Sequence, residues 1–300
     1  MKNDDLGNRM KSYYEERSRT YLTRRTPVII RLDGVAFHTF TRGMRKPFDE
    51  IFISSMQETM KYLCENTQGC VLGYTQSDEI TLVLVDYRKL NSDGWFDYQV
   101  QKMVSVSAGM ASMYFNKIFR KKATEFLGAF PSLRDELSET YIKAIEKGAF
   151  FDSRVFNIPV EEVTNCVLWR QKDAERNSIL AIGQANFSHK ELQNKSCKDI
   201  MNMLEAKGIV WGEYPTTLKR GSCCIKKDYF IDTQGKYIID LNDTYINPEG
   251  CGIYCKANDK YLGTYGCENE TLCIRSHWVI DNEIPRFVNE GREYIEELIK

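Results

Sequence analysis

The sequence predicts an α+β fold, a ferredoxin-like unit in which helices cover one face of an antiparallel sheet. Three observations carry this prediction: short apolar runs bounded by turn residues, amphipathic segments between them, and a polar turn that joins the second run to the third. The resulting order, strand, helix, strand, strand, helix, strand, is that of a split βαβ unit. Helices and short strands follow, so we expect one domain over residues 1–158 and a C-terminal region over 159–300.

The expected elements of the first domain are a charged helical lead-in over 1–26, strands over 28–32, 70–76, 79–85 and 149–156, and helices after Pro47 and over 95–122. The first apolar run ends at Asp33-Gly34, a pair typical of turns. An acidic residue therefore stands at the C-terminal end of that strand. Proline suits the first turn of a helix, which favours a helix start at Pro47. Ser77-Asp78 separates the two middle strands and makes them a hairpin candidate.

The C-terminal region combines both kinds of element. The pattern is helical from Pro159 to about Lys207, and short β-rich runs dominate from Lys219 onward. We expect strands over 222–225, 237–241 and 271–274 and a final helix over 284–300.

Composition places the chain among ordinary soluble globular proteins. It has 41 Lys and Arg against 42 Asp and Glu, and 12% of its residues are aromatic, which excludes a disordered chain and a polybasic tail. No apolar stretch approaches the roughly 18 residues of a membrane helix, and the charged N-terminus lacks the apolar centre of a signal peptide. We therefore expect a cytoplasmic protein that contacts no membrane. Its 10 cysteines are then expected to be reduced thiols.

Three carboxylates stand at neighbouring strand ends. Asp33 closes the first strand, and Asp78 and Glu79 lie at the hairpin tip, which the split βαβ order places beside it. Mg²⁺ prefers oxygen ligands, and two such ions about 3.5–4 Å apart promote in-line displacement at phosphorus. The backbone carbonyl of Gly34 could add a ligand. Each acid alone is more typical of a turn, whereas the set in this order favours a metal site.

Six motifs along the chain resemble those of the tRNA-His guanylyltransferase family. They are R-L-D-G-V-A-F-H-T-F at 31–40, K-P-F-D at 46–49, G-Y-T-Q-S-D-E at 73–79, F-D-S-R-V at 151–155, W-R-Q-K-D at 169–173 and W-V-I-D-N-E-I-P at 278–285. They occur in the family's order, and the last is similar to the tail of bacterial members. The resemblance implies a polymerase palm that adds nucleotides to the 5′ end of tRNA, so that the strand grows in the 3′–5′ direction.

The resemblance also assigns roles to residues. Asp33, Asp78 and the Gly34 carbonyl would hold two Mg²⁺ ions, with Glu79 in support. The nucleoside triphosphate, ATP or GTP, would contact the backbone of Gly34, Val35, Ala36 and Phe37, the side chains of Lys46 and Ser77, and, near its base or ribose, His38 and Asp49. The 5′ end of the tRNA would contact Arg31, Arg154, Asn177 and Ser178. The alternatives are packing or capping for His38, a solvated loop for Lys46, salt bridges for Arg31 and Arg154, and a polar helix surface for Asn177 and Ser178.

Basic residues form several short clusters that could hold the tRNA backbone. They are Arg24-Arg25, Arg42 with Arg45, Arg120-Lys121-Lys122, Lys219-Arg220 and Lys226-Lys227. Binding through such residues weakens with salt because counterions are released, but any single cluster is more often a solvated face. The family resemblance suggests a homotetramer in which residues 159–300 contribute to tRNA binding and oligomerisation.

One segment departs from the eukaryotic members of the family. Where they carry H-I-N-N-L-Y-N-T after W-R-Q-x-D, this chain has E-R-N-S-I-L-A-I, so Glu175 replaces the histidine associated with recognition of tRNA-His. The difference argues against a dedicated untemplated addition of G. It favours the bacterial and archaeal branch, in which template-directed 3′–5′ addition repairs tRNAs truncated at the 5′ end.

We therefore expect a nucleotidyltransferase that works in two steps, activation of a 5′-monophosphate by ATP or GTP and attack on that end by the 3′-hydroxyl of an incoming nucleotide. Two alternatives use the same residues: a nucleotidyl cyclase, which needs no RNA, and a non-catalytic tRNA-binding protein, in which Asp33 and Asp78 are turn residues. Cys251, Cys255, Cys267 and Cys273 lack the spacing of paired C-x₂-C zinc knuckles, so isolated thiols are the favoured reading.

Overall fold

The computed structural model of the chain describes residues 5–247, 250–268 and 270–300. Two compact units make up these residues, one formed by the chain up to Cys223 together with Asp281–Lys300, the other by Cys224–Ile280. The division expected at residue 158 falls inside the first unit. A functional boundary at that point remains a prediction.

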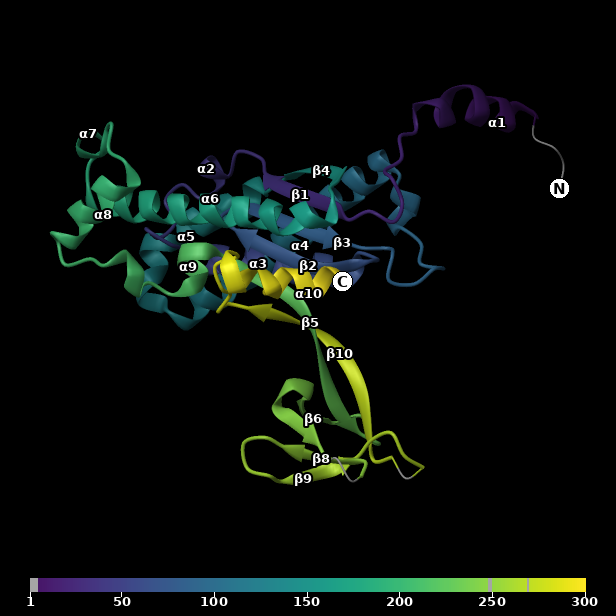
Figure 1. Cartoon of the computed structure of the whole chain (residues 1–300). Coiled ribbons are helices and arrows are strands. Elements are labelled where there is room, and N and C mark those ends of the chain that lie inside the picture. The colour runs from purple at the N-terminus through teal and green to yellow at the C-terminus, as the bar shows by residue number, and fades with distance from the viewer. Residues whose placement is uncertain (1–4, 248–249, 269) are drawn as a thin grey trace. The chain divides into compact units, whose positions relative to one another are not determined.

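Strands β1 to β4 form the sheet of the first unit, in the order β2-β3-β1-β4 (Figure 1). They are β1 (Val28–Gly34), β2 (Cys70–Gln76), β3 (Glu79–Leu84) and β4 (Phe151–Asn157), and each neighbouring pair is antiparallel. This is the strand order of a ferredoxin-like unit, so the predicted fold is confirmed. The order continues beyond β2 with β5 (Ser222–Asp232) and β10 (Leu272–Asp281), of which only Ser222, Cys223 and Asp281 belong to the first unit.

Helices α3 (Glu50–Asn66) and α4 (Val100–Ala129) pack on one face of this sheet. Ser107 of α4 and Ser153 of β4 form a hydrogen bond of 2.8 Å. Helix α3 approaches β2 so closely that a Cβ on Gly73 would lie 2.5 Å from the sulfur of Cys64. The aromatic core on this side comprises Phe37, Phe40, Phe52, Phe115, Phe119 and Phe151. Burial of this apolar surface is the main force that holds the helices to the sheet.

The opposite face of the sheet is covered by α6 (Val160–Asn186) and the C-terminal α10 (Glu293–Ile299). Arg170 of α6 donates a hydrogen bond of 2.6 Å to Glu79 of β3. The ring of Phe287, which precedes α10, packs edge-on against Tyr74 of β2. Since both faces are covered, every residue of β2 and β3 is buried.

Shorter elements connect these parts: α1 (Asp5–Met10), η1 (Lys11–Glu15), η2 (Glu16–Ser18), α2 (Phe37–Phe40), η3 (Trp95–Tyr98), α5 (Pro131–Lys147), α7 (His189–Leu192), α8 (Cys197–Glu205), η4 (Trp211–Glu213), α9 (Thr216–Arg220) and η6 (Asn289–Arg292). The expected elements do not include α5, although its buried residues Leu137, Tyr141 and Ala144 recur at the helical spacing i, i+4 and i+7. The lead-in helix ends at Ser18, earlier than expected, and the final α-helix begins only at Glu293, after a proline and a glycine.

In the second unit, β6 (Tyr237–Asp240) pairs with β5, and η5 (Leu241–Asp243) leads into a separate antiparallel sheet. This sheet consists of β7 (Thr244–Ile246), β8 (Gly252–Cys255) and β9 (Tyr261–Thr264). Phe230, Ile253 and Leu272 form the small core of the unit. Over the residues that the structure describes, no group of three or more His, Cys, Asp or Glu could hold a metal ion, and no helix is long and apolar enough to span a membrane.

Candidate active site

The turn between β2 and β3 brings two carboxylate residues to one edge of the sheet. Asp33 lies near the end of β1, opposite Glu79 in the register, and Asp78 occupies the turn. The Gly34 N–H donates a hydrogen bond of 3.0 Å to the Asp78 carbonyl, which fixes the turn to the end of β1. Ser77 adopts a φ of 50°, in the left-handed region, and its hydroxyl donates to Oδ1 of Asp78 at 3.1 Å.

The two carboxylates interact unfavourably with each other. Burial, and after it the negative charge of Asp33, raises the pKa of Asp78. Within the described part of the chain, neither carboxylate has a Lys, Arg or His in ion-pair distance. A pair of acids without a compensating cation could hold a divalent metal ion, which prefers oxygen ligands.

Glu79 differs from these two acids because it already has a cationic partner. Its Oε1 accepts from Nε of Arg170 at 2.6 Å, and both side chains are about nine-tenths buried. Arg170 also lies 2.9 Å from Asp173 on its own helix. Burial raises the pKa of Glu79, and Arg170 opposes that shift. Glu79 therefore anchors α6 to the sheet behind the acid pair.

The loop after β1 is shaped by its glycine. A Cβ on Gly34 would lie 2.2 Å from the ring of Phe37, so a larger residue would displace that ring from the aromatic core. Ala36 has a φ of 54° and precedes the short helix α2. The Phe37 side chain is buried, so only its backbone can face a ligand, whereas Val35 and His38 are exposed.

A cavity of 250 Å³ opens beside the β2–β3 turn, within the first unit. Its walls come from that turn, the segment that leads into α3, and parts of α3, α6 and α9. Its lining includes Lys46, Asp49, Gln57, Gln76, Ser77, Asn177, Ser178 and Thr217. Five residues predicted from the sequence, Lys46, Asp49, Ser77, Asn177 and Ser178, therefore share one cavity although they come from segments far apart in the chain.

Three of these five side chains are engaged within the protein, the first being Ser77, whose hydroxyl donates to Asp78. Asp49 caps α3 and accepts a hydrogen bond of 2.8 Å from the hydroxyl of Tyr141. The buried Ser178 hydroxyl accepts from Nε1 of Trp211 at 2.9 Å, so this position is not an exposed helix surface. Lys46, in contrast, is exposed and has no hydrogen bond or ion pair among the residues described. The other cation of the lining, Arg45, lies 4.5 Å from the centroid of the Phe126 ring, so Lys46 is the cavity cation whose side chain has no partner among the described residues.

The amide of Gln57, in the cavity wall, lies within hydrogen-bond distance of three side chains. Nε2 of Gln57 lies 3.1 Å from the Thr217 hydroxyl, 2.7 Å from the Ser222 hydroxyl and 2.8 Å from Oδ1 of Asn282. Asn282 directly follows β10, so Gln57 links α3 to α9 and to the segment with which the chain returns to the first unit.

Arg31 and Arg154 lie opposite each other on β1 and β4. Because side chains alternate along a strand, Arg31 shares a face of the sheet with Asp33. Arg154 lies 3.4 Å from Asp152. The Arg31 guanidinium lies 5.3 Å from the centroid of the Trp169 ring. The structure thus places two of the residues predicted to contact the 5′ end, Arg31 and Arg154, on strands beside the acid pair.

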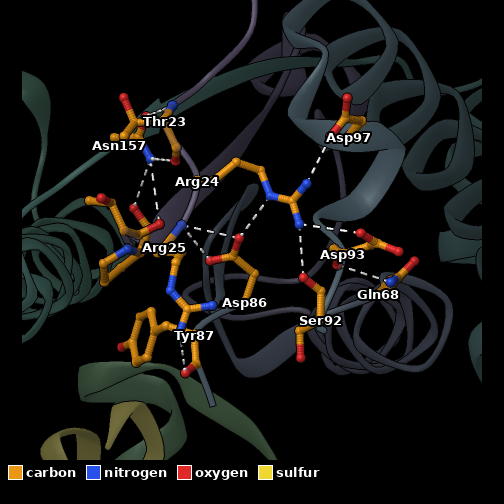
Figure 2. A network of polar contacts seen from close by, with 12 residues as sticks. Thr23, Arg24, Arg25, Gln68, Asp86, Tyr87, Ser92, Asp93, Asp97 and Asn157 are labelled. Atoms are coloured by element: carbon orange, nitrogen blue, oxygen red, sulfur yellow. Dashed lines mark hydrogen bonds and ion pairs between the residues drawn. The ribbon is translucent and has the colours of Figure 1, made fainter. Parts of the chain in front are cut away.

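Arg24, in one of the predicted basic clusters, is instead the centre of the polar network that Figure 2 shows after β3. Its guanidinium lies 3.3 Å from carboxylate oxygens of Asp86 and Asp93 and 3.1 Å from Asp97. The Arg25 N–H donates to Asp86 at 2.9 Å. These acids compensate the charge of Arg24, and the network ties the segment before β1 to the chain after β3, so an RNA contact by Arg24 stays a prediction.

Lys219 and Arg220 end α9 and are half-buried. The Lys219 ammonium donates to the Gly212 carbonyl and lies over the ring of Trp211. The Arg220 carbonyl accepts from the Tyr74 hydroxyl at 2.6 Å, and its Nε is buried without a hydrogen-bond partner. Their role in holding tRNA stays a prediction.

A family model described as tRNAHis guanylyltransferase matches residues 7–159, which is more than half of the chain. The chain belongs to this family. A bacterial tRNA(His) guanylyltransferase (Thg1)-like protein solved in complex with ATP is 34% identical, with a TM-score of 0.71 over 98% of this chain and 99% of that chain. A similar protein in complex with GTP is 33% identical, with a TM-score of 0.65 over the same shares. A probable tRNA(His) guanylyltransferase of Dictyostelium discoideum is 24% identical over 67% of this chain and 75% of its own length.

The family that the six motifs indicate is therefore confirmed, and the chain is a nucleotidyltransferase that binds nucleotides and acts on tRNA. The motifs also point to residues whose roles sequence reasoning missed. Trp169 and Arg170 stand in W-R-Q-K-D, but only the structure pairs them with Arg31 and Glu79. No sequence signal singles out Gln57, because its three partners lie between 160 and 225 residues away.

Proposed function

We propose that this enzyme extends the 5′ end of tRNA in the 3′–5′ direction and repairs truncated ends by templated addition. The observation that carries the proposal is the cavity at Lys46 and Ser77, which opens next to the uncompensated carboxylates of Asp33 and Asp78. A nucleoside triphosphate with its base in this cavity would direct its phosphates toward Lys46, Ser77 and the acid pair. Solved complexes of similar bacterial proteins with ATP and with GTP support a nucleotide site.

The acid pair also fits Mg²⁺. Asp33, Asp78 and the Gly34 carbonyl offer hard oxygen ligands, and no cation of the described chain offsets the charge of the two carboxylates. Because this is only a partial ligand set, substrate phosphates and water would complete the coordination. When bound, two such ions would activate the attacking hydroxyl and stabilise charge on the leaving group.

The reaction would take two displacements at phosphorus. An oxygen of the tRNA 5′-monophosphate attacks the α-phosphorus of ATP or GTP, and pyrophosphate leaves. The 3′-hydroxyl of the incoming nucleotide then attacks the activated 5′ phosphate, and the nucleoside monophosphate leaves. Lys46 and Ser77 would hold the triphosphate, the Gly34–Phe37 backbone would border it, and His38 and Asp49 would lie near the base or ribose. This arrangement accelerates the reaction by placing the reactants, with no side-chain base required.

Templated addition is supported by the environment of Glu175. This residue replaces a histidine of the eukaryotic pattern, and its carboxylate accepts hydrogen bonds of 2.8 and 2.9 Å from Arg286. An ion pair therefore occupies the position where eukaryotic members would read tRNA-His. The enzyme would then select the incoming nucleotide by its base pairing with the opposite strand of the tRNA.

We also infer that the enzyme is a cytoplasmic homotetramer and that residues 159–300 contribute to tRNA binding and oligomerisation. The family resemblance supports the tetramer. Arg31 and Arg154 would contact the 5′ end, with Asn177 at the cavity wall.

The test is incorporation of radiolabelled nucleotides, with Mg²⁺ and ATP, into a tRNA transcript and into the same transcript lacking its first nucleotide. We expect addition to the truncated transcript, and only of the nucleotide complementary to the opposite base. Equal incorporation of mismatched nucleotides would contradict templating. Cyclic nucleotide formation without RNA would indicate a cyclase, and tRNA binding without incorporation a non-catalytic binding protein.

A further inference from the structure

Two arginines gather against one exposed indole beside the acid pair. Trp169 and Arg170 are neighbours on α6, and Arg31 lies on β1, two residues before Asp33 and on the same strand face. The Arg31 guanidinium lies 5.3 Å, and the Arg170 guanidinium 4.4 Å, from the centroid of the Trp169 ring. The indole is therefore shared by a cation of the sheet and a cation of the helix.

The three arginines of this region differ in their partners. Arg170 is bound to the buried carboxylate of Glu79. Arg154, opposite Arg31 on β4, lies 3.4 Å from Asp152. Arg31 has neither a hydrogen bond nor an ion pair with any residue in the described ranges, and its guanidinium lies against the indole of Trp169. The N–H donors of Arg31 are thus free for an anionic ligand.

Trp169 is 53% exposed although it is the largest type of side chain. Its Nε1 has no hydrogen-bond partner in the part of the chain that the structure describes. Packing in the core therefore does not explain why a tryptophan stands at this position. A cation over an indole face is stabilised by the ring quadrupole, which makes the contact with Arg31 the interaction that the geometry supports.

We propose that Trp169 is a positioning residue that holds Arg31 for the terminal phosphates of the RNA 5′ end. The inference rests on the proposed function, because a 5′ end that reacts beside Asp33 must bring its phosphates to this strand face. A guanidinium presents a planar fork of donors that matches phosphate oxygens. The ligand is thus an RNA strand with a phosphorylated 5′ end. The competing arrangement, in which the terminal base stacks directly on Trp169, makes a different prediction.

The experiment is a double-mutant cycle on RNA binding without Mg²⁺ or nucleotide. The full-length protein and its Arg31→Ala, Trp169→Ala, Trp169→Phe and doubly substituted R31A/W169A variants are titrated with an acceptor-stem hairpin. The hairpin carries either a 5′-triphosphate or a 5′-hydroxyl, and the ratio of the two dissociation constants is the readout. Tyr237→Ala is the matched control, since Tyr237 is also 53% exposed but lies in the second unit.

We expect each alanine substitution to lower the phosphate preference, with the loss for Trp169→Ala about twofold to thirtyfold, the range of cation–π contacts. The double variant should lose no more than Arg31→Ala alone, because Trp169 acts through Arg31. Trp169→Phe should keep part of the preference, and Tyr237→Ala all of it. Losses that multiply in the double variant, or an unchanged preference in Trp169→Ala, would overturn the proposal.

The cycle measures binding alone, so its failure is distinguishable from failure of the proposed function. If wild-type protein incorporates nucleotide but Trp169→Ala keeps its phosphate preference, only the positioning role is wrong. If the cycle behaves as expected but wild-type protein incorporates nothing, only the polymerase activity is wrong.

Discussion

Arg286 donates two hydrogen bonds to the carboxylate of Glu175, from Nε at 2.8 Å and from Nη2 at 2.9 Å. Glu175 lies on α6, and Arg286 directly follows the last family motif near the C-terminus. Beside this pair, Gln171 of α6 accepts a hydrogen bond of 3.0 Å from the Phe287 N–H. The residue that departs from the eukaryotic pattern thus fastens the C-terminal segment to the helix behind the acid pair.

Glu175→Ala and Arg286→Ala should each lower the free energy of unfolding by about 1 kcal/mol or less, because Arg286 is more than half exposed and solvent screens the pair. Urea denaturation of both variants and of the double variant measures this. Lys172→Ala, at an exposed position of the same helix, is the control and should change little. A coupling free energy of zero between the two substitutions would show that the ion pair does not stabilise the protein.

Gly34→Ala should destabilise the protein by about 1–3 kcal/mol, because the new Cβ would displace the Phe37 ring from the core. Its nucleotide incorporation should fall as well, since the loop beside Asp33 must shift. The control is Gly109→Ala on α4, where no atom lies within 4 Å of the added Cβ. That substitution should stabilise the helix by about 0.5–1 kcal/mol. Thermal melts of both variants test this prediction. Equal melting temperatures of the two variants would contradict it.

Gln57→Leu should raise the KM for nucleoside triphosphates severalfold while leaving kcat less affected. The substitution keeps the approximate size of the side chain but removes the amide donor that Thr217, Ser222 and Asn282 share, so the cavity wall loosens. We expect a stability loss of about 1 kcal/mol, because Ser222 still bonds to Thr217 and to Asn282. Steady-state kinetics with varied nucleotide concentration tests this. An unchanged KM would mean that the amide network does not shape the nucleotide site.

Arg170→Met should be severely destabilising, by about 3–5 kcal/mol, because it leaves the carboxylate of Glu79 buried without its cation. The double variant Arg170→Met with Glu79→Leu removes both charges and should recover much of that loss. Chemical denaturation of the two variants is the measurement. If the double variant were as unstable as the single one, lost packing rather than the lone charge would be responsible.

The sheet could be predicted from the sequence because each of its strands is a short apolar run that ends at a turn signal, such as Asp33-Gly34 or Ser77-Asp78. The same signals place two acids, Asp33 and Asp78, at neighbouring strand ends. The centre of the candidate site could therefore also be predicted from the sequence. Helix α5 could be predicted as well, since its buried residues Leu137, Tyr141 and Ala144 recur at helical spacing, although the expected elements omit it.

Contacts between residues that lie far apart in the chain could not be predicted from the sequence. The partners of Arg24 lie between 62 and 73 residues away, so no local pattern shows that this residue anchors two segments of the protein to each other. Ser178 follows a polar residue on its helix, yet it is buried, and its hydroxyl accepts a hydrogen bond from Trp211. Charge and polarity are visible in a sequence, whereas the partners that neutralise them appear only in the fold.

The central claim is that the carboxylates of Asp33 and Asp78 carry the nucleotidyl transfer. It is tested most directly by Mg²⁺-dependent incorporation into a 5′-truncated tRNA by Asp33→Asn and Asp78→Asn variants, with Asp93→Asn, a remote and exposed acid, as control. The claim predicts no incorporation by the two variants and normal incorporation by the control. Thermal stability of Asp78→Asn should be unchanged or higher, because a buried charge beside Asp33 is removed. Wild-type incorporation by either folded variant would contradict the claim.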